Sequence, residues 1–160
     1  MAARAEPKQF AIALGGPADL DDVMQVMSAA FSSEFGEGWS RSQCGGILPL
    51  SGVRLVVARD GDGAPAGFTL ERAVADEAEL LLLAVAPRFQ SCGLGSALLE
   101  QFIAAHAGGR ITRLHLEVRD GNRAVGIYAR AGFTPAGRRK DYYRGRDGSR
   151  HDAITMVRER

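Results

Sequence analysis

Residues 80–100, LLLLAVAPRFQSCGLGSALLE, constrain the fold of this chain more than any other segment. A continuous apolar run ends at Val85, a turn that contains glycine follows, and after Gly93 the apolar residues recur at helical spacing. The segment therefore predicts a buried strand, a tight turn and the N-terminus of a helix. The first backbone N–H groups of a helix lack internal acceptors and lie at the positive end of its dipole. Such a turn is a candidate binding site for an anion, most often a phosphate.

Two common phosphate-binding loops do not fit this turn. The dinucleotide-binding fingerprint would need its third glycine where Leu98 stands, and the turn lacks the Gly-Lys-Ser/Thr sequence of a nucleoside-triphosphate loop. The turn instead reads Gln-Ser-Cys-Gly-Leu-Gly over residues 90–95, after Val-Ala-Pro at residues 85–87. A site for a different phosphate-bearing ligand is therefore expected.

The composition of the chain is that of a globular protein, and we expect residues 1–160 to form a single domain. The chain is 46% hydrophobic with a net charge of +1, which gives no general attraction to nucleic acid or to a membrane surface. Its leucine run is too short to span a membrane, and residues 1–10 lack the apolar core of a signal peptide. Cys44 and Cys92 form no CxxC pair, so neither a disulfide framework nor a metal site is expected. These features favour a cytoplasmic protein without membrane or nucleic-acid partners.

Hydrophobic periodicity and turn residues predict the order of the elements. Strands are expected at residues 10–14, 53–59, 66–74, 79–85, 111–118, from about 133, and at 153–157. Helices are expected from residue 19, after a cap at Ser40, and at 93–107 and 123–130. The order β-α-α-β-β-β-α-β-α-β-β is that of an α/β fold with a mixed central sheet flanked by helices. Strand 79–85 is too continuously apolar for an edge and should lie mid-sheet, whereas a basic loop should separate the last two strands.

Strand 111–118 alternates apolar and polar residues, so its polar face would carry His115, Glu117 and Arg119. From spacing alone, Glu117 is a glutamate that faces solvent, and a lone histidine in a strand is more often structural than catalytic. Trp39, the only tryptophan, is expected in the core rather than stacked on a ligand.

Several motifs resemble those of the GCN5-related N-acetyltransferase (GNAT) family. Residues 85–95 are similar to the acyl-CoA pyrophosphate loop of that family, and residues 122–133 are similar to its Asn-x-x-Ala…Tyr-x-x-x-Gly-Phe segment. Leu-Glu-Val-Arg at residues 116–119 and Tyr-Tyr…His-Asp-Ala-Ile-x-Met at 142–156 are most similar to the ribosomal-protein-alanine N-acetyltransferase branch. The motifs extend over about residues 79–157. Before them, only Trp39-Ser40 with Gln43 resembles the branch.

The resemblance implies a single-domain acetyltransferase fold that uses acetyl-CoA as cosubstrate. It implies direct transfer of the acetyl group, in a ternary complex, to the N-terminal α-amine of a ribosomal protein of the small subunit. The residues that it implies for cofactor binding lie on the strand end, the turn and the later helix: Leu83, Ala84, Val85, Gln90, Ser91, Cys92, Gly93, Leu94, Gly95, Ser96, Asn122 and Tyr128.

The resemblance also assigns the catalytic groups. Glu117 would be the general base that takes a proton from the amine, and Glu79 is the second candidate because other family members use a glutamate on the preceding strand. Tyr128 would be the general acid, since a phenol stays protonated at neutral pH and can donate to the departing thiolate. Without the motif, Tyr128 reads equally as a core aromatic. A covalent route through Cys92 is conceivable at a helix N-terminus, but no partner base accompanies it.

Three departures from the branch pattern bear on the function. Ser91-Cys92 stands where the branch usually has two arginines, so the turn must rely more on backbone donors. The segment from Asn122 to Tyr128 is one residue shorter than in the family. Loss of one residue from a helix turns the residues that follow it by about 100° about the helix axis. Either the loop before the helix compensates for the missing residue, or Asn122 is displaced from its usual contact. His151 stands where the branch has glutamate, a change that bears on acceptor preference.

Two other functions remain open at this point. One is acetylation of a small amine such as an amino acid, a polyamine or an aminoglycoside. The other is a CoA-binding module without catalysis, which the departures at Ser91-Cys92 and Asn122 favour and the presence of Glu117 and Tyr128 disfavours. Basic residues at 138–150 form either a solvated face or a surface that docks on a ribosomal subunit.

Overall fold

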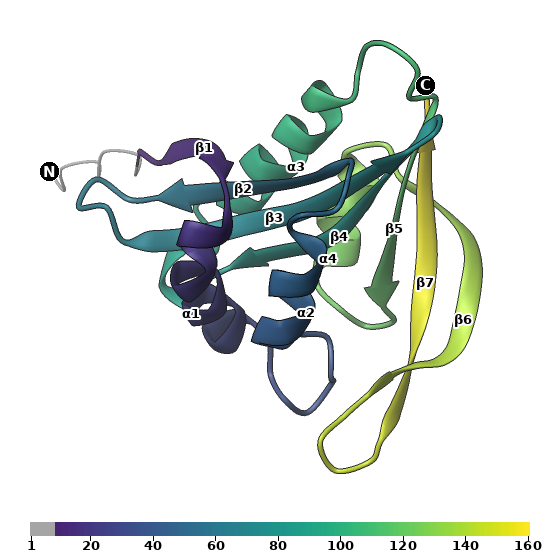
Figure 1. The fold of residues 1–160 in the computed structure, drawn as a ribbon. Coiled ribbons are helices and arrows are strands. Elements are labelled where there is room, and N and C mark those ends of the chain that lie inside the picture. Colours follow the sequence, from purple (N-terminus) through teal and green to yellow (C-terminus); the bar gives the residue numbers. More distant parts are fainter. Residues whose placement is uncertain (1–8) are drawn as a thin grey trace, which may run out of the picture.

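The computed structural model describes residues 9–160 (Figure 1). In order, the elements are β1 (Ala11–Gly15), α1 (Leu20–Ala30), α2 (Arg41–Ile47), β2 (Val53–Arg59), β3 (Pro65–Val74), β4 (Glu77–Val85), α3 (Leu94–Ala105), β5 (Arg113–Arg119), α4 (Ala124–Arg130), β6 (Thr134–Arg144) and β7 (Arg150–Glu159). Two 3-10 turns, η1 (Pro17–Asp19) and η2 (Pro87–Phe89), precede α1 and α3. This order of strands and helices confirms the predicted α/β fold. Residues 1–8, which bear on the expectation of no signal peptide, lie outside the described residues.

The strands form one mixed sheet in the order β1-β2-β3-β4-β5-β7-β6. The central pair β4 and β5 is parallel, and the remaining neighbours in the described sheet are antiparallel. Helices α1 and α2 cover one face and α3 and α4 the other (Figure 1). Among the described residues, no helix is long and apolar enough to cross a membrane. The mid-sheet position of β4 confirms the prediction made from its apolar run.

The prediction of a long basic loop between the last two strands is wrong. β6 continues to Arg144 and β7 begins at Arg150, so residues 145–149 alone form the connection. β6 is an edge strand whose side chains are almost all exposed, and charged residues are common on edges because they prevent pairing with other chains. Its pairing with β7 is irregular between Arg139 and Tyr143, where Asp141 has a φ of 54°. With no buried face, β6 lacks the alternation by which a strand is recognised in sequence.

The leucine run of β4 serves two cores because the strand carries a β-bulge. Leu70 of β3 pairs with Leu82 and the next residue of β3 pairs with Leu80, which leaves Leu81 unpaired. Leu80 consequently packs in the cluster under α3 and α4, whereas Leu82 packs in the cluster under α1 and α2. Residues two apart in a regular strand would share a face. The bulge explains why this strand needs apolar side chains in succession.

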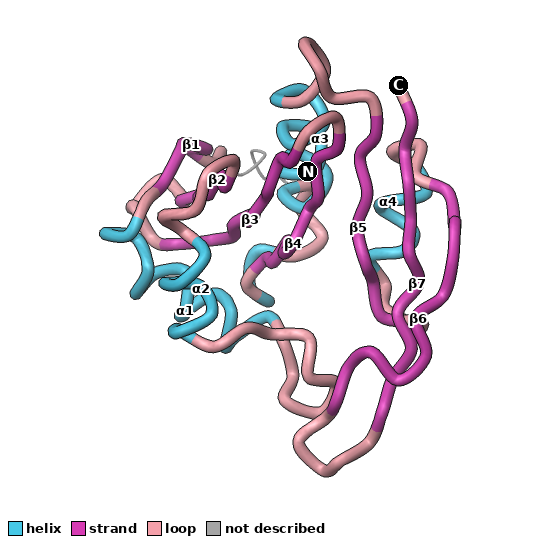
Figure 2. The backbone as a smooth tube through the Cα atoms, turned by 45° about the vertical axis from the view of Figure 1, so that its right-hand side comes forward, coloured by secondary structure: helices cyan, strands magenta, loops and turns pink. Residues whose placement is uncertain are grey.

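β4 and β5 pair only from Glu77 to Leu80 and from Arg113 to Leu116. Beyond this point β4 follows β3 while β5 follows β7, so the two strands diverge (Figure 2). This divergence leaves backbone groups on the facing edges without a strand partner.

Candidate active site

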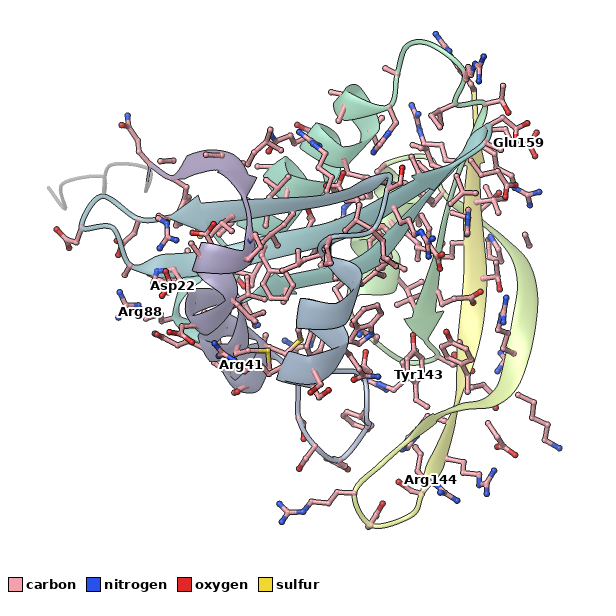
Figure 3. All side chains as sticks on the ribbon, in the orientation of Figure 1. Asp22, Arg41, Arg88, Tyr143, Arg144 and Glu159 are labelled. Carbon is pink, nitrogen blue, oxygen red and sulfur yellow. The ribbon has the colours of Figure 1, made fainter. Side chains whose placement is uncertain are left out.

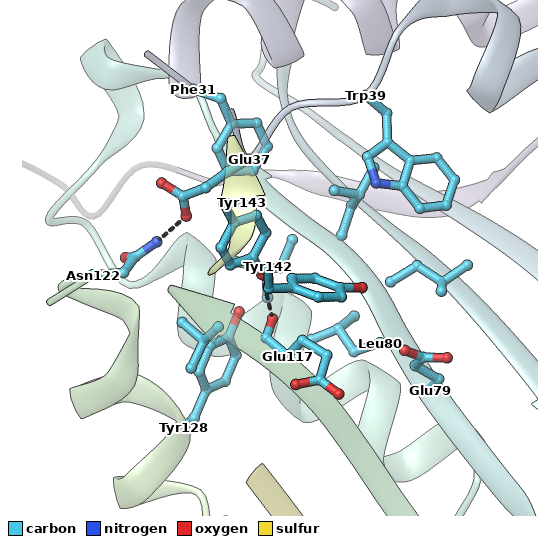
Figure 4. Close-up of a pocket in the computed structure, with 14 residues that line it drawn as sticks. Phe31, Glu37, Trp39, Glu79, Leu80, Glu117, Asn122, Tyr128, Tyr142 and Tyr143 are labelled. Atoms are coloured by element: carbon cyan, nitrogen blue, oxygen red, sulfur yellow. Dashed lines mark hydrogen bonds between the residues drawn. The ribbon is translucent and has the colours of Figure 1, made fainter. Parts of the chain in front are cut away.

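A pocket lies where β4 and β5 diverge (Figure 4). Its cavity volume is about 90 Å³. We call it the central pocket; it is lined by Phe31, Glu37, Trp39, Glu79, Leu80, Leu81, Leu82, Leu83, Glu117, Val118, Asn122, Tyr128, Tyr142 and Tyr143. These residues come from β4, from the segment between α1 and α2, from β5 to α4, and from β6. The pocket therefore brings together Glu79, Glu117 and Tyr128, the three candidate catalytic residues.

Glu117 is held firmly in the wall of the central pocket, and its side chain is only 9% exposed. Its Oε1 lies 2.9 Å from Arg139 Nε, and its Oε2 accepts a hydrogen bond of 2.7 Å from Thr155 Oγ1. The Tyr143 hydroxyl donates to the backbone carbonyl of Glu117 over 3.3 Å. Glu117 is thus not the solvent-facing glutamate that spacing alone indicates. Each carboxylate oxygen retains capacity to accept a further hydrogen bond from water.

Glu79 lies on β4 in register with His115 of β5, on the same side of the sheet as Glu117. Within residues 9–160 its carboxylate has no hydrogen-bond or ion-pair partner. Both glutamates therefore face the central pocket, one anchored and one free (Figure 4). The geometry leaves both candidates for the base open.

Tyr128 is both a core aromatic and a pocket residue. Its ring packs edge to face on Phe133, at 6.1 Å between centroids, and only 6% of the residue is exposed. Its hydroxyl is directed into the central pocket (Figure 4), and no hydrogen-bond partner for it is present in the described part of the chain. Burial raises the pKa of the Tyr128 phenol above its ordinary value, and the negative charge of Glu37 adds to the effect. The phenol therefore stays protonated at neutral pH with its proton available.

The turn at residues 90–96 has the geometry of an anion site. Gly93 precedes α3 with a φ of 85°, and Ser91 has a φ of 62°. Ala97 is the first residue of the helix whose N–H bonds within it, to the carbonyl of Gly93. In the described structure the N–H groups of residues 91–96 have no acceptor. These free donors lie at the positive end of α3, as the sequence predicted.

The side chains of the turn bond to nearby backbone rather than reach outward. Gln90 Nε2 donates to the carbonyl of Val85 over 3.0 Å, and Cys92 Sγ donates to the carbonyl of Phe89 over 2.7 Å. Nearby Arg88 forms an ion pair with Asp60 at 3.3 Å. The turn therefore offers an anion backbone donors but no dedicated cation.

The end of β4 adjoins this turn. Residues Leu83, Ala84 and Val85 pair with β3 on one side, but the pairing with β5 has already ended at Leu80. An extended ligand can pair with such an open strand edge. The open edge therefore connects the turn at residues 90–96 with the central pocket.

The Asn122 side chain is hydrogen-bonded to two other groups of the protein. Its Oδ1 accepts a hydrogen bond from the N–H of Ala124 over 2.8 Å at the start of α4, and its Nδ2 donates to Glu37 Oε2 over 2.6 Å. The second partner, Glu37, was not among the residues predicted for the site. It comes from the segment between α1 and α2, residues 31–40, which the sequence marks only as a loop. No local sequence signal identifies a contact between residues 85 positions apart.

The segment 31–40 also contacts the β6–β7 hairpin. Arg146 N donates to the carbonyl of Ser33 over 2.9 Å, and the ring of Phe35 packs edge to face on His151 at 5.2 Å. Figure 3 shows Tyr143 beside the end of β5 and Arg144 farther along toward the hairpin tip. Position 151, where this chain departs from the branch, thus packs on the segment 31–40 and is not part of the pocket lining.

Trp39 lies partly in the core and partly in the pocket wall. It packs against the core cluster under α1 and α2, as expected, and it also lines the central pocket (Figure 4). Together with Phe31 and Tyr142 it forms an aromatic part of the pocket wall.

The comparisons with known proteins agree with this geometry. Residues 20–133 match the acetyltransferase (GNAT) family. Over 97 residues, 60% of this chain, the sequence is 43% identical to the [ribosomal protein bS18]-alanine N-acetyltransferase of Escherichia coli. The aligned segments span 62% and 65% of the lengths of the curated relatives from Haemophilus influenzae and Escherichia coli, which is less than two thirds.

Solved structures show the same fold. The crystal structure of the ribosomal-protein-S18-alanine N-acetyltransferase from Escherichia coli superposes with a TM-score of 0.84 at 31% identity, covering 94% of each chain. Arabidopsis thaliana NAA60 in complex with acetyl-CoA superposes with a TM-score of 0.82 at 17% identity, over 94% of this chain and 98% of that one, which is a likeness of fold. The family match covers most of the chain, and the structure has an open strand edge, a turn with free N–H donors and a pocket that holds the candidate catalytic residues. The chain belongs to the acetyltransferase (GNAT) family.

Proposed function

We propose that this protein is an acetyl-CoA-dependent N-acetyltransferase that acts on a protein N-terminal α-amine, that of a small-subunit ribosomal protein. The observation that carries the proposal is the central pocket, where Glu117 and Tyr128 face one cavity beside the open edge of β4. The similarity to enzymes named for the N-terminal alanine of bS18 supports this choice of acceptor. Such an acceptor places the reaction in the cytoplasm, where ribosomal proteins are made.

Cofactor binding is assigned to the turn and the strand edge. The free N–H groups of residues 91–96 would hold the pyrophosphate of acetyl-CoA, because backbone donors at a helix N-terminus favour anions. The edge at residues 83–85 would pair with the amide groups of the pantetheine arm. The central pocket, at about 90 Å³, is suited to the acetyl group and the acceptor amine rather than to the whole cofactor.

The acceptor amine must lose a proton before it can attack. An α-amino group has a pKa of about 7.7 to 8.0 and is partly protonated at neutral pH. We assign Glu117 as the base. Its Oε1 is paired with Arg139 and its Oε2 accepts a hydrogen bond from Thr155, so it would take the proton through a water molecule. Glu79, whose carboxylate is free, is the alternative.

The departing thiolate needs a proton. Once the base has passed the first proton to solvent, it takes the second amine proton as the C–N bond forms and the C–S bond breaks, while the Tyr128 hydroxyl donates its own proton to the sulfur and regains one from solvent. The Tyr128 hydroxyl is suited to this role because it faces the pocket and has no partner among the described residues. The step therefore requires neither a metal ion nor a covalent enzyme intermediate.

Mass spectrometry tests the proposal. The protein is mixed with acetyl-CoA and a peptide that has the alanine-initiated N-terminus of bS18, and a mass gain of one acetyl group is sought. The control is the same peptide with a blocked N-terminus, and free alanine and a polyamine are tested in parallel. Acetylation of the open peptide alone supports the proposal. Acetylation of the free amines alone would indicate an enzyme that acts on small molecules. CoA binding without any turnover would indicate a CoA-binding module without catalysis.

A further inference from the structure

Glu37 is a nearly buried carboxylate in the wall of the central pocket, and neither cofactor binding nor proton transfer has so far been assigned to it. Its side chain is 11% exposed. Oε1 lies 2.9 Å from Arg119 Nε, and Oε2 accepts the 2.6 Å hydrogen bond from Asn122 Nδ2. The Arg119 guanidinium also stacks on the ring of Phe35 at 3.7 Å, so Glu37 is neutralised and fixed on that side. A buried carboxylate that is paired so completely has a defined position.

Asn122 connects Glu37 to the helix that carries Tyr128. While Nδ2 binds Glu37, Oδ1 accepts from the N–H of Ala124, the first residue of α4. Tyr128 follows Ala124 by four residues and so lies on the same side of the helix, one turn farther on. α4 has seven residues, and a helix this short depends on its capping and tertiary contacts. Movement of Asn122 would therefore move the Tyr128 hydroxyl.

We propose that Glu37 is a positioning residue, which sets the place of the Tyr128 hydroxyl through Asn122 and α4. The inference rests on the proposed function of Tyr128 as proton donor. It also gives Asn122 a task different from the cofactor contact that the resemblance implies. The loop between α1 and α2 would thereby be coupled to the proton donor on the far side of the pocket.

A double-mutant cycle tests whether Glu37 acts through Tyr128. Turnover is measured for Glu37→Ala, Tyr128→Phe and the double variant, well below the unfolding temperature of each. Glu37→Ala should lower kcat on the order of 10-fold, because small misplacements of a catalytic group are costly. The dissociation constant for CoA should stay within about 2-fold of the wild-type value, because no cofactor contact is lost. The double variant should be no slower than Tyr128→Phe, and losses that multiply would overturn the inference.

Two further variants separate positioning from a general structural effect. Glu37→Gln keeps an oxygen that can accept from Asn122 and should retain more of the wild-type kcat than Glu37→Ala. Glu34→Ala is the matched control, since Glu34 lies on the same segment, is exposed and has no side-chain partner among the described residues. It should leave kcat unchanged. An equal loss of kcat in Glu34→Ala and Glu37→Ala would contradict the inference.

A spectroscopic measurement tests the same coupling without turnover. In protein labelled with ¹³C at tyrosine Cζ, the Tyr128 resonance is assigned by its absence in Tyr128→Phe. It should shift in Glu37→Ala and stay in place in Glu34→Ala. An unmoved Tyr128 resonance in Glu37→Ala would refute the positioning role. This outcome is distinct from failure of the proposed function, which would show as wild-type protein that acetylates no acceptor.

Discussion

Arg139 and Thr155 hold the Glu117 side chain in place, so a variant of the same shape can test its charge alone. Glu117→Gln keeps the shape and a hydrogen-bonding side chain but removes the carboxylate that we propose takes the proton. We expect kcat to fall by about 100-fold or more, in the range typical of a lost general base. The affinity for CoA should be nearly unchanged because the turn at residues 90–96 is untouched. Steady-state kinetics over a range of pH, with a separate CoA titration, measures both.

Glu79→Gln is the matched control for this substitution. Glu79 faces the same pocket but has no partner among the described residues, so its replacement should disturb the structure little. If Glu117→Gln retains full turnover and the wild-type pH profile while Glu79→Gln loses turnover, the base is Glu79.

Tyr128→Phe keeps the ring on Phe133 and removes only the hydroxyl. We expect kcat to fall by about 100-fold, since a general acid contributes at least this much in similar sites. Burial, helped by Glu37, raises the pKa of the phenol above its ordinary value, and an acid acts only while protonated. The alkaline loss of activity that Tyr128 causes should therefore begin above pH of about 10, the ordinary phenol value. A pH-rate profile of the wild type that declines below that pH, and does not decline in Tyr128→Phe, would contradict this.

Individual residues were predictable from sequence to different degrees. The motifs identified Glu117 and Tyr128, and the structure places both at one pocket. Arg139 was expected in a basic loop and instead anchors Glu117. Glu37 had no signal at all. Contacts of this kind depend on where distant segments meet, which no local pattern encodes.

At the scale of elements, the turn before α3 offers an anion free backbone N–H groups but no side-chain cation. Cys92→Arg restores one of the arginines of the branch at a position with ordinary backbone geometry, and we expect CoA to bind more tightly by roughly 2- to 5-fold at low salt. The gain should vanish at high salt because an exposed ion pair is screened. Calorimetric titration with CoA at two salt concentrations measures the change, and Cys92→Gln is the uncharged control. Equal affinities of the two variants at low salt would show that backbone donors suffice.

Strands β4 and β6 have features that the hydrophobic pattern of the sequence did not predict. The apolar run of β4 correctly predicted a central strand, but not the bulge at Leu81 that divides its side chains between two cores. A strand was expected from about residue 133, but the basic residues of β6 were expected in a loop, because neither face of this strand is buried. By contrast, the cap of α2 was read correctly, since Ser40 and Gln43 form a capping box whose partners are three residues apart.

At the scale of the whole molecule, we propose that the chain is one domain, since a single sheet runs through it and each face is covered by helices. Such a domain should unfold in one cooperative step. Urea unfolding followed by far-UV circular dichroism and by the fluorescence of Trp39, the only tryptophan, should give coincident transitions. Trp39 reports on the α1–α2 side and circular dichroism on the whole chain, so two separate midpoints would indicate two folding units.

The sequence by itself determined the order of the elements, the turn at residues 90–96 before α3, and the two candidate catalytic residues on β5 and α4. These depend on periodicity, turn residues and short motifs, all of which act over a few neighbouring positions. Only the tertiary structure decided which groups surround them: Arg139 and Thr155 on Glu117, and Glu37 on Asn122. The physical reason is that side-chain partners across a sheet are set by register and bulges. A shift of one residue turns a side chain to the other face.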